Sequence, residues 1–408
     1  MSFLVLTRRP DLPNLARALG SNVDSTVVVT TEVRPDSIDL IGCFRHVEQV
    51  QDYDDASVGQ SVLALACRFG VERIASTNEV DVLRAAAARQ LLGIAGQSMP
   101  SAVAFRDKYV MKSIAHAEGI PVARMRRACS RDKARAAAAE MCYPVAVKPV
   151  DGGGSVNVHR LTAAQDWASA PELTEYLVEE WIDAKAFYTV DGLMCDGDIT
   201  QHVVLRMLSG NLTFLIGRMP VAGYSLAEGF AASRHITEFV ARVLRAMPPV
   251  PHETAFHMEL FEHRSGRLML CEVASRAGGV GHAPTFGQAT GIDLNAASLL
   301  GQLGLDDPRP AQPRLREAAF AYYPKCSGTL LHHPKALRHP SVTSYVALAD
   351  AGTCTSSARW VGDCIAKIHL ASPVGADIGE QMVEVMNEYE SHTVWSQLLC
   401  GRHPAGTA

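Results

Sequence analysis

The sequence predicts an α/β fold whose central part is α+β, and three observations support that class. Residues 1–100 alternate apolar, β-branched strands with helices, a rhythm typical of a parallel sheet covered by helices on both faces. An apolar strand at residues 143–149 runs directly into the glycine-rich segment DGGGS at residues 151–155. Residues 257–282 contain two apolar stretches, separated by HRSGR, that each carry one glutamate and indicate a β-hairpin.

Composition narrows the class of protein before any motif is considered. The chain has 408 residues, of which 48% are hydrophobic and 20% charged, and its net charge is -5. This soluble, globular composition has no excess of positive charge for nucleic acid. No apolar run approaches the ~20 residues of a membrane span, and MSFLVLTRRP is typical of a first strand rather than a signal peptide. The ten cysteines form no CxxC pair, which indicates reduced thiols in a cytoplasmic protein without a zinc or disulfide framework.

The amino-terminal hundred residues predict alternating strands and helices. Apolar and β-branched runs predict strands at residues 3–7, 26–31, 38–43, 47–50 and 73–76. Helical spacing predicts helices at residues 14–19, 57–69 and 81–92, the last two ended by glycine. No GxGxxG follows the first strand, so the pattern does not indicate a dinucleotide site.

The remainder of the chain predicts a larger mixed part and a smaller β-rich part. Its helices are expected at residues 105–121, 134–140, 225–247, 294–305 and 377–388. Its strands are expected at residues 143–149, 176–182, 186–190, 200–207, 212–218, 318–323, 341–348 and 365–371, in addition to the hairpin. A segment rich in proline and aspartate at residues 306–313 separates the small β-rich part from the rest.

The hairpin carries the first candidate site. A loop of two or of four residues pairs His263 with Leu268 and places Glu259 directly opposite Glu272 on one face. A three-residue loop separates the two glutamates unless a bulge restores the phase. Two buried carboxylates side by side resist ionisation, and a divalent cation between them removes that cost. A surface hairpin whose glutamates face water accounts for this stretch equally well on its own.

Two lysines and an acidic strand end add to this picture. Lys148 ends an apolar strand, where a buried ammonium needs an anion, and the glycines after it let backbone N–H groups approach phosphates. Lys108 opens a helix and, taken alone, reads as a solvated surface lysine. The strand ends at Glu179 and Glu180, where backbone groups can form hydrogen bonds with the edge of a base. The alternative interpretation is that the two glutamates are an exposed acidic pair.

Together these segments resemble one family. The order DK, YPVAVKPVDGGGS, YLVEEWI, FYTVDG, HMELF and CEVASRAGG is similar to that of the ATP-grasp superfamily, specifically its carboxylate–amine ligases such as amino-acid ligases. The resemblance implies an ATP-grasp fold with a Rossmann-like amino-terminal domain and a small β-rich carboxyl-terminal module. The corresponding domains are residues 1–100, residues 101–313 with a lid subdomain at about 124–190, and residues 314–408.

The resemblance also implies roles for individual residues. ATP would be bound by Lys108, Lys148, Gly152, Gly153, Gly154, Ser155, Glu179, Glu180, Trp181, Ile182 and Asp183. Mg²⁺, or Mn²⁺ in its place, would be held by Glu259 and Glu272. The catalytic set would be Arg276, Lys148 and His282, with Arg276 stabilising an acyl phosphate. Gly278 and Gly279 would let the substrate approach closely.

Two departures from the family pattern stand out. Many relatives read E-x-N-x-R, where the asparagine completes the metal shell, whereas this chain has Ala274 at that position. Relatives also often carry a ribose-binding glutamate before the VDG segment. No carboxylate lies between Asp183 and Asp191 here, so Asp183 is the candidate substitute.

The implied function is ATP-dependent amide or peptide bond formation between a small-molecule carboxylate and an amine, with release of ADP and phosphate. An amino acid is the expected substrate, in specialised-metabolite biosynthesis, and a carrier protein is an alternative acceptor. Carboxylation or acyl transfer of the kind found in purine biosynthesis and in biotin carboxylases is the alternative reaction. A non-catalytic ATP-binding protein is the second alternative. The resemblance further implies a cytoplasmic homodimer without nucleic-acid or membrane partners.

Overall fold

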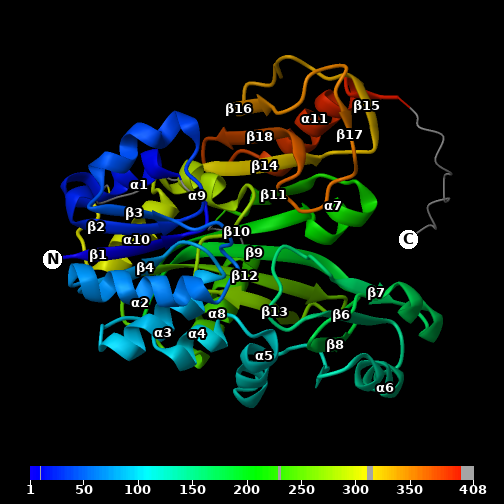
Figure 1. The fold of residues 1–408 in the computed structure, drawn as a ribbon. Coiled ribbons are helices and arrows are strands. Elements are labelled where there is room, and N and C mark those ends of the chain that lie inside the picture. Colours follow the sequence, from blue (N-terminus) through cyan, green and yellow to red (C-terminus); the bar gives the residue numbers. More distant parts are fainter. Residues whose placement is uncertain (10, 228–230, 310–315, 397–408) are drawn as a thin grey trace.

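The computed structural model describes residues 1–9, 11–227, 231–309 and 316–396. Its amino-terminal part is a parallel sheet with the strand order β3-β2-β1-β4, covered by helices on both faces (Figure 1). The strands are β1 (Phe3–Thr7), β2 (Thr26–Thr30), β3 (His46–Gln49) and β4 (Arg73–Ser76). The helices are α1 (Leu12–Leu19), α2 (Ser57–Phe69) and α3 (Asp81–Leu92). The predicted βαβ rhythm is confirmed here.

One predicted strand in this part is wrong. Residues 38–43 belong to a 3-10 helix, η2 (Pro35–Cys43), rather than to a strand. Pro35 fixes the first helical position and has no N–H to offer a sheet. Ile38 is 54% exposed, so its apolar side chain is not the buried face of a strand.

A long antiparallel sheet forms the centre of the molecule, with the strand order β13-β12-β9-β10-β11-β14-β18-β16 (Figure 1). Its strands are β9 (Ala184–Cys195), β10 (Asp198–Ser209), β11 (Val221–Ser225), β12 (Thr254–His263), β13 (Leu268–Ala274), β14 (Glu317–Pro324), β16 (Val342–Ala347) and β18 (Cys364–Ser372). On one face, the strands β9, β12 and β13 pack on α5 (Lys108–Ala117) and α8 (Ala231–Ala246). On the other face lie α9 (His282–Thr290) and α10 (Leu294–Leu303).

The carboxyl-terminal strands extend this sheet rather than forming a sheet of their own. Strand β14 pairs with β11, and β18 pairs with both β14 and β16. Helix α11 (Ile378–Ser391) covers β14 and β18, and a small sheet of β15 (Gly328–His332), β17 (Cys354–Thr355) and β19 (Val394–Trp395) lies beside them. Part of the predicted break at residues 306–313, and the end of the predicted module after residue 396, lie outside the described residues.

A second local prediction also fails near the sheet. Residues 212–218, expected as a strand, form most of α7 (Asn211–Gly217). The Thr213 hydroxyl accepts a hydrogen bond from the Gly210 N–H at 3.1 Å and donates one to the Gly210 carbonyl at 2.7 Å, which closes the first helical turn locally. Phe214 is buried in α7 whereas Ile216 is 70% exposed, so this apolar run does not supply the alternating face of a strand.

The hairpin takes the three-residue form. Its last pair is His263 with Arg267, and Gly266 sits at φ +81 in the loop, a left-handed position that suits glycine. Leu268 therefore pairs with Glu262, and the expected pairing of His263 with Leu268 is wrong. A register shift between Glu259 and Leu260 then restores the phase, so that Glu259 still lies opposite Glu272.

The segment predicted as a lid contains a separate sheet, called the lid sheet below, with the strand order β5-β8-β6-β7 and packed on α6 (Arg131–Met141). Its strands are β5 (Met125–Ala128), β6 (Val145–Pro149), β7 (His159–Leu161) and β8 (Tyr176–Glu180). The glycine-rich segment connects β6 to β7. Figure 1 shows this sheet beside the β12–β13 end of the central sheet, and the candidate site lies between them.

Candidate active site

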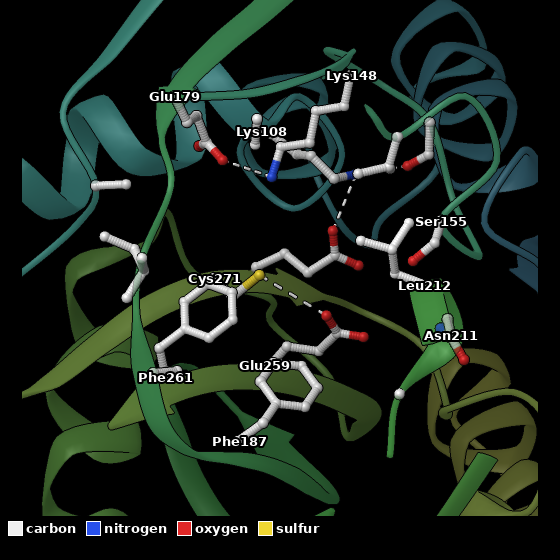
Figure 2. A pocket seen from close by; sticks show the side chains of 18 of the residues that line it. Lys108, Lys148, Ser155, Glu179, Phe187, Asn211, Leu212, Glu259, Phe261 and Cys271 are labelled. Atoms are coloured by element: carbon white, nitrogen blue, oxygen red, sulfur yellow. Dashed lines mark hydrogen bonds and ion pairs between the residues drawn. The ribbon is translucent and has the colours of Figure 1, made fainter. Parts of the chain in front are cut away.

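A cavity of about 460 Å³ lies between the lid sheet and the central sheet (Figure 2). That volume is in the range of small-molecule and cofactor sites. Most of the residues predicted from the sequence line it: Lys108, Lys148, Gly152, Gly153, Gly154, Ser155, Glu179, Glu180, Trp181, Ile182, Asp183, Glu259, Glu272 and His282. Segments as far apart in sequence as Lys108 and His282 therefore meet in one place.

Glu272 and Lys108 form the first charged pair of the cavity. The Lys108 Nζ lies 3.1 Å from the Glu272 Oε2, and it also donates to the Gly152 carbonyl at the start of the glycine-rich segment. Burial would raise the pKa of Glu272, but Lys108 and Lys148 outweigh it and lower that pKa to about 2. The expectation that the two glutamates resist ionisation is therefore wrong for Glu272, because the lysines compensate its charge.

A second, fully buried cluster joins Lys112, Glu179 and Lys148. The Glu179 carboxylate accepts from Lys112 through Oε1, and its Oε2 lies 2.6 Å from the Lys148 Nζ. Burial would raise the pKa of Glu179, but the two ammonium groups lower it to about 2. Burial lowers the pKa of Lys112, whereas for Lys148 the effect of burial is outweighed by Glu179, which raises its pKa. Lys148 is therefore the cation that an anionic phosphate in the cavity would meet.

Lys112 was missed by the sequence analysis, although its spacing offered a signal. It follows Lys108 by four residues on α5, so the two side chains lie on the same face of the helix. The helix begins at Lys108 rather than at the predicted residue 105, because the Asp107 side chain caps it by accepting hydrogen bonds from the Tyr109 and Val110 N–H groups. The cap thus fixes where both lysines point.

At the strand end of β8 the acidic side chains are engaged with arginines. Arg124 donates from its Nε to Glu180 at 2.7 Å, and Arg264 donates from its Nε to Asp183 at 2.5 Å. Arg160 stacks on Trp181, 4.8 Å from the ring centroid. The Glu180 and Asp183 carboxylates are therefore both engaged by arginines.

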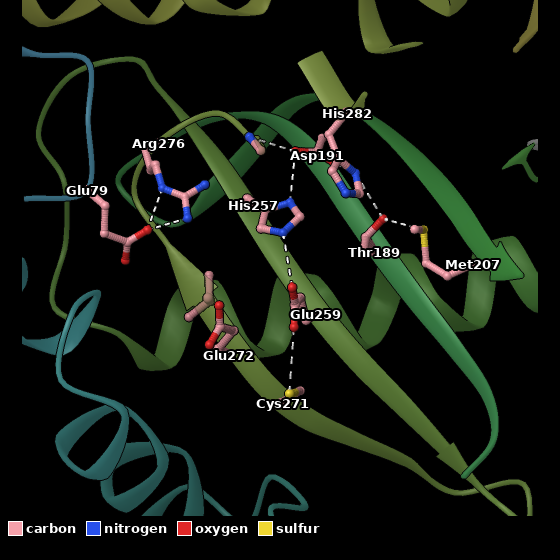
Figure 3. A network of polar contacts seen from close by, with 12 residues as sticks. Glu79, Thr189, Asp191, Met207, His257, Glu259, Cys271, Glu272, Arg276 and His282 are labelled. Atoms are coloured by element: carbon pink, nitrogen blue, oxygen red, sulfur yellow. Dashed lines mark hydrogen bonds and ion pairs between the residues drawn. The ribbon is translucent and has the colours of Figure 1, made fainter. Parts of the chain in front are cut away.

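Arg276 lies outside the cavity lining and pairs with the amino-terminal part of the chain. Its Nε donates to the Glu79 Oε2 at 2.5 Å, and Arg106 approaches the same carboxylate at 3.3 Å (Figure 3). The Arg276 charge nevertheless contributes to lowering the pKa of Glu272. Glu79 was not predicted from the sequence, and no local pattern marks it, since its partner is 197 residues away.

A buried histidine–carboxylate cluster closes the inner end of the site (Figure 3). The Asp191 Oδ1 lies 3.0 Å from the His257 Nδ1, and its Oδ2 lies 3.1 Å from the His282 Nδ1. Burial would lower the pKa of His257, but Asp191 and Glu259 raise it to about 10. The sequence analysis missed Asp191 and His257. His257 precedes Glu259 by two residues, a spacing that places both on one face of a strand.

Gly278 is packed directly against this cluster. Its N–H donates to the Asp191 Oδ1 at 3.0 Å, and an added Cβ would lie 2.3 Å from that oxygen and 2.7 Å from the His257 Nδ1. We therefore expect Gly278→Ala to lower the free energy of unfolding by about 1–3 kcal/mol. Gly279→Ala is the matched control, because among the described residues its Cβ would meet nothing within 4 Å. Equal urea midpoints for the two variants would contradict this packing.

The donor set of the cavity fits a hard divalent cation. Glu259 and Glu272 lie opposite one another on neighbouring strands and both face the cavity. Carboxylate oxygens of this kind are the ligands that Mg²⁺ and Mn²⁺ prefer. Position 274 offers no ligand atom, because the side chain of Ala274 is a methyl group.

The chain is similar to known proteins in sequence and in fold. No family model matches the chain. An L-arginine-specific L-amino acid ligase of Bacillus subtilis is 27% identical over 267 residues, which are 62% of this chain and 63% of that protein. The crystal structure of an L-amino acid ligase from Bacillus licheniformis matches with a TM-score of 0.74 and 17% identity, over 97% of this chain and 99% of that one. The chain therefore has the ATP-grasp fold.

A further solved structure of the same fold was determined with nucleotide. It is a carboxyaminoimidazole ribonucleotide synthase of Aspergillus clavatus complexed with ATP, which matches this chain with a TM-score of 0.68 and 14% identity, over 95% of this chain and 98% of that one. The match to the curated B. subtilis relative spans less than two thirds of that relative's length. Within the described residues, no helix combines the length and apolar character needed to cross a bilayer.

Proposed function

We propose that this ATP-grasp protein joins a carboxylate to an amine at the expense of ATP. The carboxylate attacks the γ-phosphate, which gives an acyl phosphate and ADP, and the amine then displaces phosphate to leave an amide. The observation that carries the proposal is the convergence of Lys108, Lys148, Glu259 and Glu272 on one cavity. The likeness to L-amino acid ligases supports it and favours an amino acid as one of the two substrates.

In this proposal the lysines bind the phosphates and the glycine-rich segment covers them. Lys148 is 7% exposed, and its Nζ lies 2.6 Å from the Glu179 Oε2 beside the cavity. Gly152 and Gly154 both line the cavity, and their backbone can approach phosphate oxygens closely. Covering the site keeps water from the acyl phosphate, which would otherwise hydrolyse.

The glutamates hold the metal, and the arginine acts nearby. Glu259 and Glu272 would hold Mg²⁺ or Mn²⁺. The bound cation would neutralise part of the negative charge on the phosphates. Arg276, positioned by Glu79, keeps a positive charge beside Glu272 that suits the developing acyl phosphate. Adenine would lie along the backbone of Glu180 to Ile182 at the strand end of β8.

A phosphate-release screen tests the proposed function. The full chain is incubated with ATP, Mg²⁺ and pairs drawn from the proteinogenic amino acids, and products are identified by mass spectrometry. We expect phosphate only with particular pairs, together with a product whose mass equals the two amino acids less one water. ATP turnover that is unaffected by any amino acid would contradict the proposal.

Carboxylation is the second candidate reaction, favoured by the likeness to carboxyaminoimidazole synthases and by His282 after the glycines. Bicarbonate distinguishes the two reactions. A ligase should release phosphate at the same rate in solutions depleted of bicarbonate, whereas a carboxylase should stop. The homodimer, the cytoplasmic location and the carrier-bound acceptor stay predictions, and analytical ultracentrifugation tests the first of them.

A further inference from the structure

His257 lies on the same face of the hairpin as Glu259 and Glu272, and the proposed function gives it no role. It lies on β12 two residues before Glu259, with its Nε2 3.5 Å from the Glu259 Oε1 (Figure 3). Across the hairpin it lies directly opposite Ala274, so both residues share one face of the sheet. The imidazole therefore lies on the same face of the hairpin as position 274, where the alanine offers no ligand atom.

Asp191 fixes which ring nitrogen faces Glu259. The Asp191 Oδ1 lies 3.0 Å from the His257 Nδ1, and a carboxylate can only accept, so the proton is on Nδ1. Without metal, a proton on Nε2 faces the Glu259 oxygen, and a bound cation would take the place of that proton between the two atoms. Carboxylate, imidazole and metal in a row is the usual arrangement around a metal-bound histidine, in which the carboxylate sets the tautomer.

The separation of these atoms suits a shared ion. Two ligands that are each about 2.1 Å from one ion, at angles of roughly 90° to 110°, lie about 3.0 to 3.5 Å apart. The 3.5 Å between the His257 Nε2 and the Glu259 Oε1 falls at the upper end of that range. His257 is only 5% exposed and Asp191 only 1%, so packing holds the ring in this orientation.

We propose that His257 is a third protein ligand of the active-site metal ion, oriented by Asp191 and acting beside Glu259 and Glu272. This inference rests on the proposed function, because it assumes that a metal–nucleotide complex binds in the cavity. In the proposed site, the His257 imidazole supplies the ligand atom that Ala274 does not offer. An imidazole nitrogen in the shell shifts preference from Mg²⁺ toward Mn²⁺, since Mg²⁺ favours oxygen ligands more strongly.

Electron spin-echo spectroscopy of bound Mn²⁺ tests the coordination directly. The full chain is saturated with Mn²⁺ and ADP, and the spectrum is recorded with natural histidine and with ¹⁵N-labelled histidine. We expect a ¹⁴N modulation typical of a coordinated imidazole, replaced by the ¹⁵N pattern in the labelled protein. A Mn²⁺–ADP–protein complex without any histidine modulation would overturn the proposal and leave the proposed function intact.

Variants identify which histidine is coordinated. His257→Leu should abolish the modulation and weaken Mn²⁺ binding in the presence of ADP by about tenfold, with about threefold or less for Mg²⁺. His282→Asn is the matched control, because His282 contacts the same Asp191 but is not aligned with Glu259. If His282→Asn removes the modulation as well, the ion belongs to the Asp191, His257 and His282 cluster, and the proposal is wrong.

A compensating substitution covers the case in which His257→Leu fails to fold. Ala274→Asn, added to His257→Gln, supplies an oxygen ligand on the same face of the hairpin. We expect this double variant to bind Mg²⁺ with ADP at least as tightly as the wild type and to lose the preference for Mn²⁺. A retained preference for Mn²⁺ would contradict the role of His257. If the wild type binds no metal–nucleotide complex at all, the proposed function fails instead.

Discussion

Glu272→Gln is expected to lower amide formation by about a thousandfold while the protein stays folded. The substitution keeps the shape of the side chain and removes its charge. The carboxylate of Glu272 is the partner of Lys108 and lies opposite Glu259, so its loss removes a metal ligand and alters the charge beside the phosphates. The measurement is single-turnover ADP formation with an amino-acid pair that the screen identifies.

Glu262→Gln is the matched control for this prediction. Glu262 lies on the same hairpin, and its carboxylate pairs with Lys185 at 3.1 Å and accepts from the Tyr188 hydroxyl at 2.8 Å, away from the cavity lining. Its replacement should leave ADP formation within about threefold of the wild type, because it lies outside the site. Near-normal turnover in Glu272→Gln would remove the basis for the metal site, and so would near-normal turnover in Arg276→Ala.

Glu179→Gln should have the largest effect on stability, lowering the free energy of unfolding by about 3–5 kcal/mol. The reason is the buried cluster, in which Glu179 is the anion shared by Lys112 and Lys148. Without that anion, two buried ammonium groups repel one another, and Glu272 compensates the charge of Lys148 only in part. The measurement is urea unfolding at neutral pH, together with binding of an ATP analogue, which should also weaken because the lysines are displaced.

Glu180→Gln is the matched control for Glu179→Gln. It changes the adjacent residue in the same way, but Glu180 pairs with the exposed Arg124 rather than with buried lysines, so its urea midpoint should stay close to that of the wild type. Lys112→Met should partly rescue Glu179→Gln, because it removes one of the uncompensated charges. Equal losses in Glu179→Gln and Glu180→Gln would contradict the cluster.

The pH dependence of stability provides an independent check on Glu179. Its pKa in the folded state is lowered to about 2, below the ordinary value of 4.5 that applies when the chain unfolds. The stabilisation is therefore complete above about pH 4.5 and is lost as the pH falls toward about 2. Glu179→Gln should flatten this acid limb of the stability profile, and an unchanged limb would show that another carboxylate is responsible.

Local signals in the sequence located most of the secondary structure and most of the site. Helices with clear caps or glycine stops, such as α2 and α3, were placed correctly because their ends are set by nearby residues. The short apolar runs in η2 and α7 were misread as strands, because alternation over so few residues does not distinguish a strand from a helical turn. The sequence was consistent with a hairpin loop of two, three or four residues. It therefore could not show that the three-residue loop and its compensating bulge would form.

The order of lysines, glycines and glutamates along the chain was enough to indicate which side chains could bind ATP and a metal. How the charges of those side chains are compensated depends on tertiary contacts that the order does not reveal. Lys108 pairs with Glu272, Lys148 shares Glu179 with Lys112, and Arg276 is held by Glu79. Lys112 and Glu179 are 67 residues apart in the sequence, and Arg276 and Glu79 are 197 residues apart. The periodicity of apolar residues carries no information over such separations. The pairing of Asp191 with His257 could not be predicted for the same reason, because it depends on the register between β9 and β12.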